Sequence, residues 1–235
     1  MKMLKLLYIN KKNKGFILSY VLLLSMVLLG YLFMIAMRAE GYQPEIYKKG
    51  YIYFCSLAFL LSTIILPLWE MKEKDYLKGL VEVLIFIFSA IPLILILLIV
   101  GKISIEYILL PLLIQILWGV TIFSIKNILN SLKLQMRLKA FVLIIFNFFV
   151  LIFSMIYLFF YSQYANLVIT TIFDKDIPSI FFINPLLSLT GVLYEQMGGS
   201  NQMGMKPFLV CFVFWAIFSS VIAYSSSKMA KHQGV

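Results

Sequence analysis

The chain has 235 residues and a net charge of +10; 63% of its residues are hydrophobic and only 13% are charged. Soluble domains contain about a quarter charged residues, so this composition excludes an ordinary soluble protein and predicts an integral membrane protein. The lysines stand at the ends of apolar runs. This pattern is typical of topology determination and excludes a nucleic-acid-binding stripe.

The N-terminal residues 1–14 carry five lysines and no acid. Their apolar positions can share one helical face, which predicts an interfacial helix on an anionic membrane surface. The apolar run that follows, residues 16–37, has about twenty residues, more than the hydrophobic region of a signal peptide. We expect it to be the first spanning helix. The second spanning helix is predicted over residues 50–68.

The connection to the third span is dense in charge but locally neutral. Six charged residues fall within nine positions: Glu70, Lys72, Glu73, Lys74, Asp75 and Lys78. They cannot lie in hydrocarbon, so this stretch leaves the membrane. As a helix it would place Trp69 and Tyr76 on one face as interfacial anchors. Its zero net charge fits a protein partner better than lipid headgroups, and the alternative is a solvated turn.

The next two spans are predicted over residues 79–100 and 108–125. Pro92 should kink the first of them, whereas Pro111 lies in the first turn of the second, where a missing N–H costs little. Residues 126–139 are amphipathic and purely basic. They form either a surface-lying helix or extensions of the neighbouring spans. A long fifth span, over residues 140–165, should be tilted or protrude.

The apolar segment 177–194 decides between two topologies. Counting it as a span gives seven helices and places the carboxyl end outside. Six spans, the last over residues 207–225, place both termini in the cytoplasm with 14 of the 20 lysines and arginines in inner segments. The positive-inside rule favours six. Asn184 and Pro185 interrupt the segment, so we expect it to enter the outer leaflet and return, as one part of a single domain over residues 1–235.

The sequence contains no motif of catalysis or metal binding. There is one histidine, His232, near the carboxyl end, and no Walker A pattern. We therefore expect no catalytic residue, no bound metal and no cofactor in this chain. Cys55 and Cys211 lie near the same outer end of their apolar runs, which leaves two interpretations: a disulfide, or two small buried hydrophobic side chains. We favour the second.

Three polar residues within the spans are candidates for lining a pathway. Glu82 lies one turn inside the third span and could instead be an interfacial acid that reaches water. Gln115 and Asn147 lie in the fourth and fifth spans, where an interhelical hydrogen bond is the commoner role.

The order of these parts resembles the permease subunits of ABC-2-type ABC transporters over essentially the whole chain. The stretch Glu70-Met-Lys-Glu-Lys-Asp-Tyr-Leu-Lys-Gly79 is similar to the family's coupling helix, in which a glutamate is followed by basic residues and a glycine. The segment Phe181-Phe-Ile-Asn-Pro-Leu-Leu-Ser188 resembles the Asn-Pro segment that precedes the last span of such permeases.

The resemblance implies an exporter of hydrophobic or amphipathic cargo, such as a peptide toxin or an antimicrobial peptide, in the cell membrane. Two copies of a separate ATP-binding subunit would hold ATP and Mg²⁺, and a second permease subunit, identical or homologous, would complete the path. The implied ATPase-coupling residues are Glu70, Lys72, Glu73, Lys74, Asp75, Tyr76, Lys78 and Gly79. The alternative function is a non-transporting membrane immunity or scaffold protein, whose composition would look the same.

Overall fold

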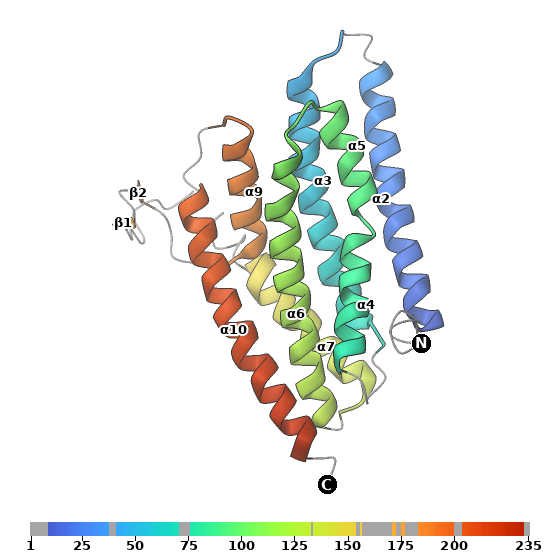
Figure 1. The fold of residues 1–235 in the computed structure, drawn as a ribbon, viewed down its shortest axis with the longest axis vertical. Coiled ribbons are helices and arrows are strands. Elements are labelled where there is room, and N and C mark those ends of the chain that lie inside the picture. Colours follow the sequence, from blue (N-terminus) through green and yellow to red (C-terminus); the bar gives the residue numbers. More distant parts are fainter. Residues whose placement is uncertain are drawn as a thin grey trace. The chain divides into compact units, whose positions relative to one another are not determined.

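Among the residues that the structure describes, the regular elements are helices, apart from one short β-hairpin (Figure 1). Strands β1 (Thr171–Ile172) and β2 (Lys175–Asp176) pair antiparallel in this hairpin. The structure, a computed structural model, describes residues 9–37, 41–70, 76–132, 134–153, 156, 171–172, 175–176, 183–199 and 204–232.

Six helical segments among the described residues are long and apolar enough to cross a membrane. Their mean hydropathy lies between 2.0 and 3.3. The prediction of a helical membrane protein with six candidate spans is therefore confirmed. The segments are Lys11–Met37, Pro44–Leu68, Leu77–Val100, Ile105–Ser131, Met136–Phe153 and Met205–Ser226.

The chain forms two compact units, Met1–Gly119 and Val120–Val235. The boundary falls inside helix α6 (Leu109–Ser131), between Gly119 and Val120. Each unit has its own buried side chains.

Unit 1 begins with helices α2 (Lys11–Met37) and α3 (Pro44–Ile65), which run side by side (Figure 1). On α2 the buried side chains Tyr20, Leu24 and Leu28 recur every four residues and therefore share one face. The hydroxyl of Tyr20 donates to the carbonyl of Ala58 on α3 at 3.2 Å. Leucines on the other face of α2 are exposed, as expected of a helix that meets lipid on one side.

The third span is broken in the middle, as the sequence predicts. Helix α4 (Tyr76–Phe88) ends at a turn over Ser89 and Ala90, and α5 (Ile91–Val100) begins directly after it. Pro92 lies in the first turn of α5. It lacks an N–H, and its ring clashes with the carbonyl four residues earlier, so the helix cannot continue regularly through this point.

Two short 3-10 helices are the other regular elements in the described part of unit 1. η1 (Leu66–Leu68) follows α3 and contains Pro67, and η2 (Ile105–Ile108) leads into α6. On α6, Gly119 lies against α4, because a Cβ atom there would come within 2.9 Å of Ile87 Cδ1 and 3.0 Å of Val83 Cγ1.

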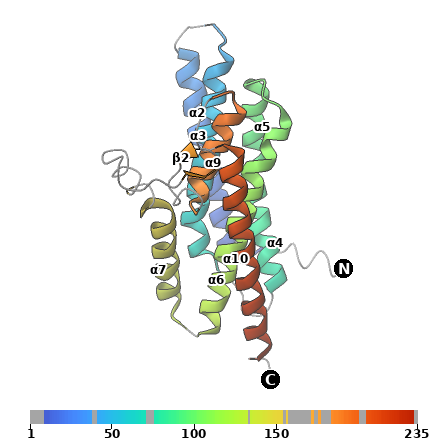
Figure 2. The same cartoon turned by 90° about the vertical axis from the view of Figure 1, so that its left-hand side faces the viewer.

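Unit 2 contains the rest of α6, then α7 (Met136–Asn147), the π-helix η3 (Phe148–Phe153), α9 (Pro185–Gln196) and α10 (Met205–His232). Helix α9 lies along the first half of α10 (Figures 1 and 2). A turn that uses a left-handed Gly198, with φ of 86°, follows α9. The Glu195 carboxylate then accepts the N–H of Met205 at 2.6 Å, which caps the start of α10.

Polar side chains join α6 to α10 within unit 2. Thr121 is hydrogen-bonded to Ser219, and the amide of Asn127 donates to the hydroxyl of Ser226. Pairs of this kind are usual between helices in a membrane, where small polar side chains have no water to bind.

Several helices extend beyond the predicted spans. Helix α2 begins at Lys11 and not at residue 16, α3 begins at Pro44 and not at residue 50, and α10 ends at His232 and not at residue 225. Hydropathy detects the apolar part of a helix, whereas hydrogen bonding continues into the polar ends. Pro111 and Pro207 are each the third residue of their helix, which keeps both in a first turn.

The two interpretations of residues 126–139 are resolved in favour of extended spans. Helix α6 runs to Ser131 and α7 begins at Met136, so only residues 132–135 separate them. The predicted N-terminal interfacial helix falls largely on residues 1–8, outside the described residues, and Lys12 and Lys14 belong to α2. The predicted fifth span is described only as far as Phe153 and at residue 156.

Candidate functional site

Five residues of unit 1 form a polar cluster where α2 begins and α3 gives way to α4. The polar cluster consists of Asn10, Lys12, Asn13, Glu70 and Glu82. Asn10 directly precedes α2, and Lys12 and Asn13 lie in its first turn. Glu70 follows η1, and Glu82 lies in the second turn of α4. The cluster therefore joins α2 and α4 to the chain segment that follows η1.

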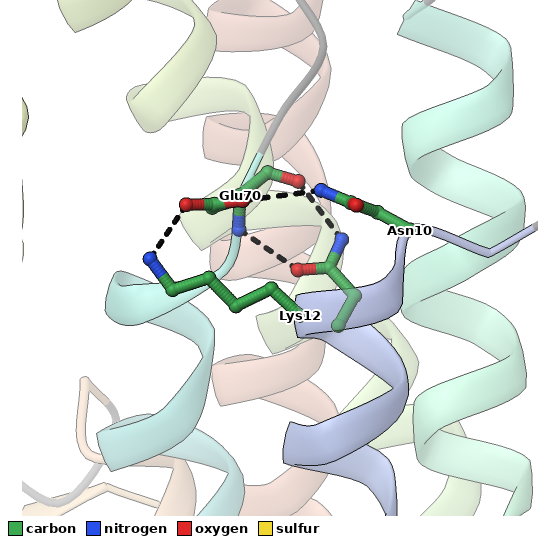
Figure 3. A network of polar contacts seen from close by, with 4 residues as sticks. Asn10, Lys12 and Glu70 are labelled. Atoms are coloured by element: carbon green, nitrogen blue, oxygen red, sulfur yellow. Dashed lines mark hydrogen bonds and ion pairs between the residues drawn. The ribbon is translucent and has the colours of Figure 1, made fainter.

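The side chain of Glu70 is held by the start of α2 (Figure 3). Lys12 Nζ lies 2.5 Å from Glu70 Oε1, and Asn10 Nδ2 donates to Glu70 Oε2 at 3.1 Å. The two side chains of the ion pair are 55% and 31% exposed. A pair this open to solvent contributes below about 1 kcal/mol, so it orients Glu70 more than it stabilises the fold.

Asn13 is the fully buried centre of the polar cluster. Its Nδ2 donates to Glu82 Oε2 at 2.6 Å and to the carbonyl of Glu70 at 2.9 Å. Its Oδ1 accepts the N–H of Glu70 at 3.0 Å. One amide thus satisfies a buried carboxyl group on α4 and both backbone groups of the residue where the α3–α4 connection starts.

The sequence analysis did not identify Asn13. It stands among lysines, and no local spacing relates it to Glu70 or Glu82, which lie 57 and 69 positions further along the chain. The sequence offered only a weak indication of its role, since Asn13 is an amide side chain at the point where a basic segment is followed by an apolar run.

Trp69 lies in an aromatic layer next to the polar cluster. Its ring is 1% exposed, and its centroid is 6.3 Å from that of Phe16 and 5.3 Å from that of Phe86. The prediction of Trp69 as an interfacial anchor on one helical face with Tyr76 is therefore wrong. Pro67 ends α3 in a 3-10 turn, and Trp69 adopts extended backbone with φ of −58° and ψ of 133°, so the ring turns into the protein.

The predicted coupling residues fall into three groups. Glu70 is not helical and belongs to the polar cluster. Lys72, Glu73, Lys74 and Asp75 lie outside the described residues. Tyr76, Lys78 and Gly79 lie in the first turn of α4, and the candidate span begins at Leu77, where the sequence predicts residue 79. These three residues are therefore part of the same helix as the third candidate span, not of a separate helix.

The pathway candidates have different surroundings. Glu82 is 6% exposed and bound by Asn13. Gln115 is 1% exposed, and neither polar atom of its amide finds a hydrogen-bond partner among the described residues. It lies one turn before Gly119, on the face of α6 that meets α4. Asn147 is 7% exposed at the junction of α7 and η3 in unit 2.

Asn184 organises a second junction, in unit 2. Its Oδ1 accepts the N–H groups of Leu186 at 2.9 Å and Leu187 at 3.1 Å, which caps α9, and Pro185 occupies the first turn. Its Nδ2 donates to the carbonyl of Leu151 in the π-helix at 3.1 Å. The interruption predicted at Asn184 and Pro185 is thus the start of a helix.

Helix α10 also holds the start of α9. Trp215 Nε1 donates to the carbonyl of Ile183 at 2.7 Å. Trp215 lies near the middle of the apolar part of α10, Met205–Ser226, so α9 starts halfway along that span.

Cys55 and Cys211 are both buried free thiols. They belong to different units. This agrees with the favoured interpretation of two small buried side chains.

No model of a known protein family matches this chain, and no curated protein or solved structure matches it either. Any function must therefore be argued from the residues and their geometry.

Proposed function

We propose that this chain is the membrane-spanning subunit of an ATP-driven exporter of the ABC-2 type, and that a separate subunit binds ATP and Mg²⁺. The observation that carries the proposal is the polar cluster. It ties the charged connection between α3 and α4 to the start of α2 and to α4 at one point. A soluble partner that displaces this connection would move three membrane helices together.

In this proposal the coupling contact is made by Lys72, Glu73, Lys74 and Asp75, together with Lys78 at the start of α4. Glu70 has a different role from the one that the resemblance implies. Its carboxylate is bound by Lys12 and Asn10 within the chain, so it transmits motion to α2 and does not offer a free charge to the partner. Asn13 passes the same displacement to Glu82 on α4.

The start of α9 supports a re-entrant segment. Helix α9 has 12 residues, a length of about 18 Å at 1.5 Å per residue, whereas a hydrocarbon core is about 30 Å thick. It begins beside the middle of α10 and ends near the start of α10. A backbone that turns at membrane depth must be packed against protein, and the contacts of Asn184 and Trp215 supply that packing.

The asymmetry of positive charge supports a position in the cell membrane with both termini in the cytoplasm. The α3–α4 connection is then cytoplasmic, where an ATP-binding subunit can reach it. The mostly apolar spans fit a hydrophobic or amphipathic cargo. A second permease subunit, identical or homologous, would complete the path.

Co-purification with an ATP-binding subunit encoded next to this chain tests the proposal. Neutralising the connection in Glu73→Gln with Asp75→Asn should weaken the complex at least about tenfold, because a desolvated charged contact costs roughly 2–5 kcal/mol when one partner is truncated. The matched control, Glu45→Gln with Glu106→Gln, neutralises one acid in the first turn of α3 and one in η2, and it should leave binding unchanged.

Coupling is measured separately from binding. Asn13→Ala should leave the complex intact but abolish the ATP-dependent distance change between spin labels placed on α2 and α4. If the unaltered chain binds no ATP-binding subunit, the exporter proposal fails and the non-transporting membrane protein is favoured. If the Glu73→Gln/Asp75→Asn variant binds the ATP-binding subunit as well as the Glu45→Gln/Glu106→Gln control does, the α3–α4 connection is not the contact.

A further inference from the structure

The turn between α6 and α7 is basic, and the neighbouring sequence contains no acid. No aspartate or glutamate occurs between Glu106 and Asp174 or after Glu195. In unit 2, Glu195 caps the start of α10, whereas the α6–α7 turn lies at the end where α10 finishes (Figures 1 and 2). On the described helices of unit 2, the acidic residue is Glu195, and it lies at the opposite end from this turn.

Lys139, in the first turn of α7, is the central residue of this basic turn. Its side chain is only 9% exposed, and its Nζ donates to Oδ1 of Asn130 on α6 at 2.8 Å. Asn130 is a neutral amide, and an ammonium group has three N–H donors. A buried charge is costly unless an opposite charge accompanies it. The position therefore calls for an anion.

Neighbouring groups add to the positive potential. Arg137 is exposed beside Lys139 at the rim of the turn. The N-terminus of α7 has no side-chain cap, since Gln135 makes none, so N–H groups of the first turn also face outward.

The surroundings favour a lipid over a soluble anion. The turn joins two candidate spans, Ile105–Ser131 and Met136–Phe153, and it therefore lies at a membrane surface. Apolar side chains next to it are exposed, with Leu138 at 46% and Phe141 at 58%. A phospholipid offers a phosphate for the cations and acyl chains for these apolar side chains.

We propose that the turn between α6 and α7 binds an anionic phospholipid. The phosphate contacts Lys139, with Arg137 at the rim, and the acyl chains lie along Leu138 and Phe141. This site is independent of any ATP-binding subunit and goes beyond the proposed transport function. It would make the packing of α7 on α6 depend on the lipid composition of the leaflet.

The test compares the unfolding temperature of the full chain in phosphatidylcholine nanodiscs with and without phosphatidylglycerol. Phosphatidylglycerol should raise the unfolding temperature, and Lys139→Gln should raise the phosphatidylglycerol content needed for half of that effect roughly fivefold, the effect of one lysine at an anionic surface. Lys139→Arg should keep the response. Lys48→Gln is the matched control, because Lys48 pairs with Glu45 in unit 1.

Arg137 is exposed, so Arg137→Gln tests the same site should Lys139→Gln fail to fold, and it should lower the response. The lipid assignment is tested by adding inorganic phosphate to the detergent-solubilised chain, which should not raise the unfolding temperature. An equal response to phosphatidylglycerol in the unaltered chain and in the Lys139 or Arg137 variant overturns the proposal. Stabilisation by inorganic phosphate as large as that by the lipid overturns the assignment to lipid.

Discussion

Replacing Asn13 by alanine should destabilise this protein more than its position near the chain terminus suggests. The substitution removes three hydrogen bonds: one to the carboxyl group of Glu82 and two to the backbone of Glu70. Glu82 is 6% exposed and Asn13 is fully buried, so water cannot simply replace the lost amide.

The size of the effect follows from which groups lose their partner. A buried polar group left unsatisfied costs about 1–3 kcal/mol, and more when it is charged. The carboxyl group of Glu82 should account for about 2–3 kcal/mol and the N–H of Glu70 for about 1 kcal/mol. The carbonyl of Glu70 is partly buried and can find water. We therefore expect a loss of about 3–4 kcal/mol in the free energy of unfolding.

The assay is unfolding in mixed micelles by titration with sodium dodecyl sulfate, followed by circular dichroism. Asn10→Ala is the matched control, because it removes the same side-chain amide but only one contact, made to a partly exposed carboxylate. It should cost below about 1 kcal/mol. A double-mutant cycle with Glu82→Gln should give a coupling energy of about 1–3 kcal/mol. Equal effects of Asn13→Ala and Asn10→Ala would refute the role given to Asn13.

Three further predictions concern topology, the start of α9 and the packing of α6. Single cysteines can be introduced at the expected outer positions, Lys175 and Asn201, and at the expected inner positions, Lys12, Lys133 and His232. In intact cells an impermeant thiol reagent should label the outer cysteines but not the inner ones. Labelling of a cysteine at position 232 would favour the seven-span topology. Asn184→Ala should lower the free energy of unfolding by about 1–3 kcal/mol, since it removes the helix cap and the bond to Leu151, whereas an effect no larger than that of Pro185→Ala would contradict this role. Gly119→Ala should destabilise by about 1 kcal/mol through its contacts with Ile87 and Val83, while Gly30→Ala, with no atom within 4 Å of the added Cβ, should be neutral or stabilising in the same unfolding assay; similar effects at the two glycines would argue against close packing of α6 on α4.

The amino-acid sequence by itself determined the features of this protein that depend on local chemistry. About twenty consecutive apolar residues must cross the membrane as a helix, because no other short segment satisfies its own backbone there. Six such segments were therefore predictable. The interruptions at Pro92 and at Asn184-Pro185 were predictable for the same kind of reason, since proline removes a donor within its own turn.

Only the tertiary structure decided which distant residues meet. The contacts of Asn13 with Glu70 and Glu82 span 57 and 69 positions, and nothing in the local sequence encodes them. The same holds for Trp69: hydropathy and charge placed it at an interface, but the 3-10 turn at Pro67 directs its ring between Phe16 and Phe86. The periodicity argument assumed a single helix that contains both Trp69 and Tyr76. In the structure α3 ends at Ile65 and α4 begins at Tyr76, so Trp69 lies in neither helix. The fold thus placed a charged residue that the sequence suggested for a partner, Glu70, in a contact within the chain.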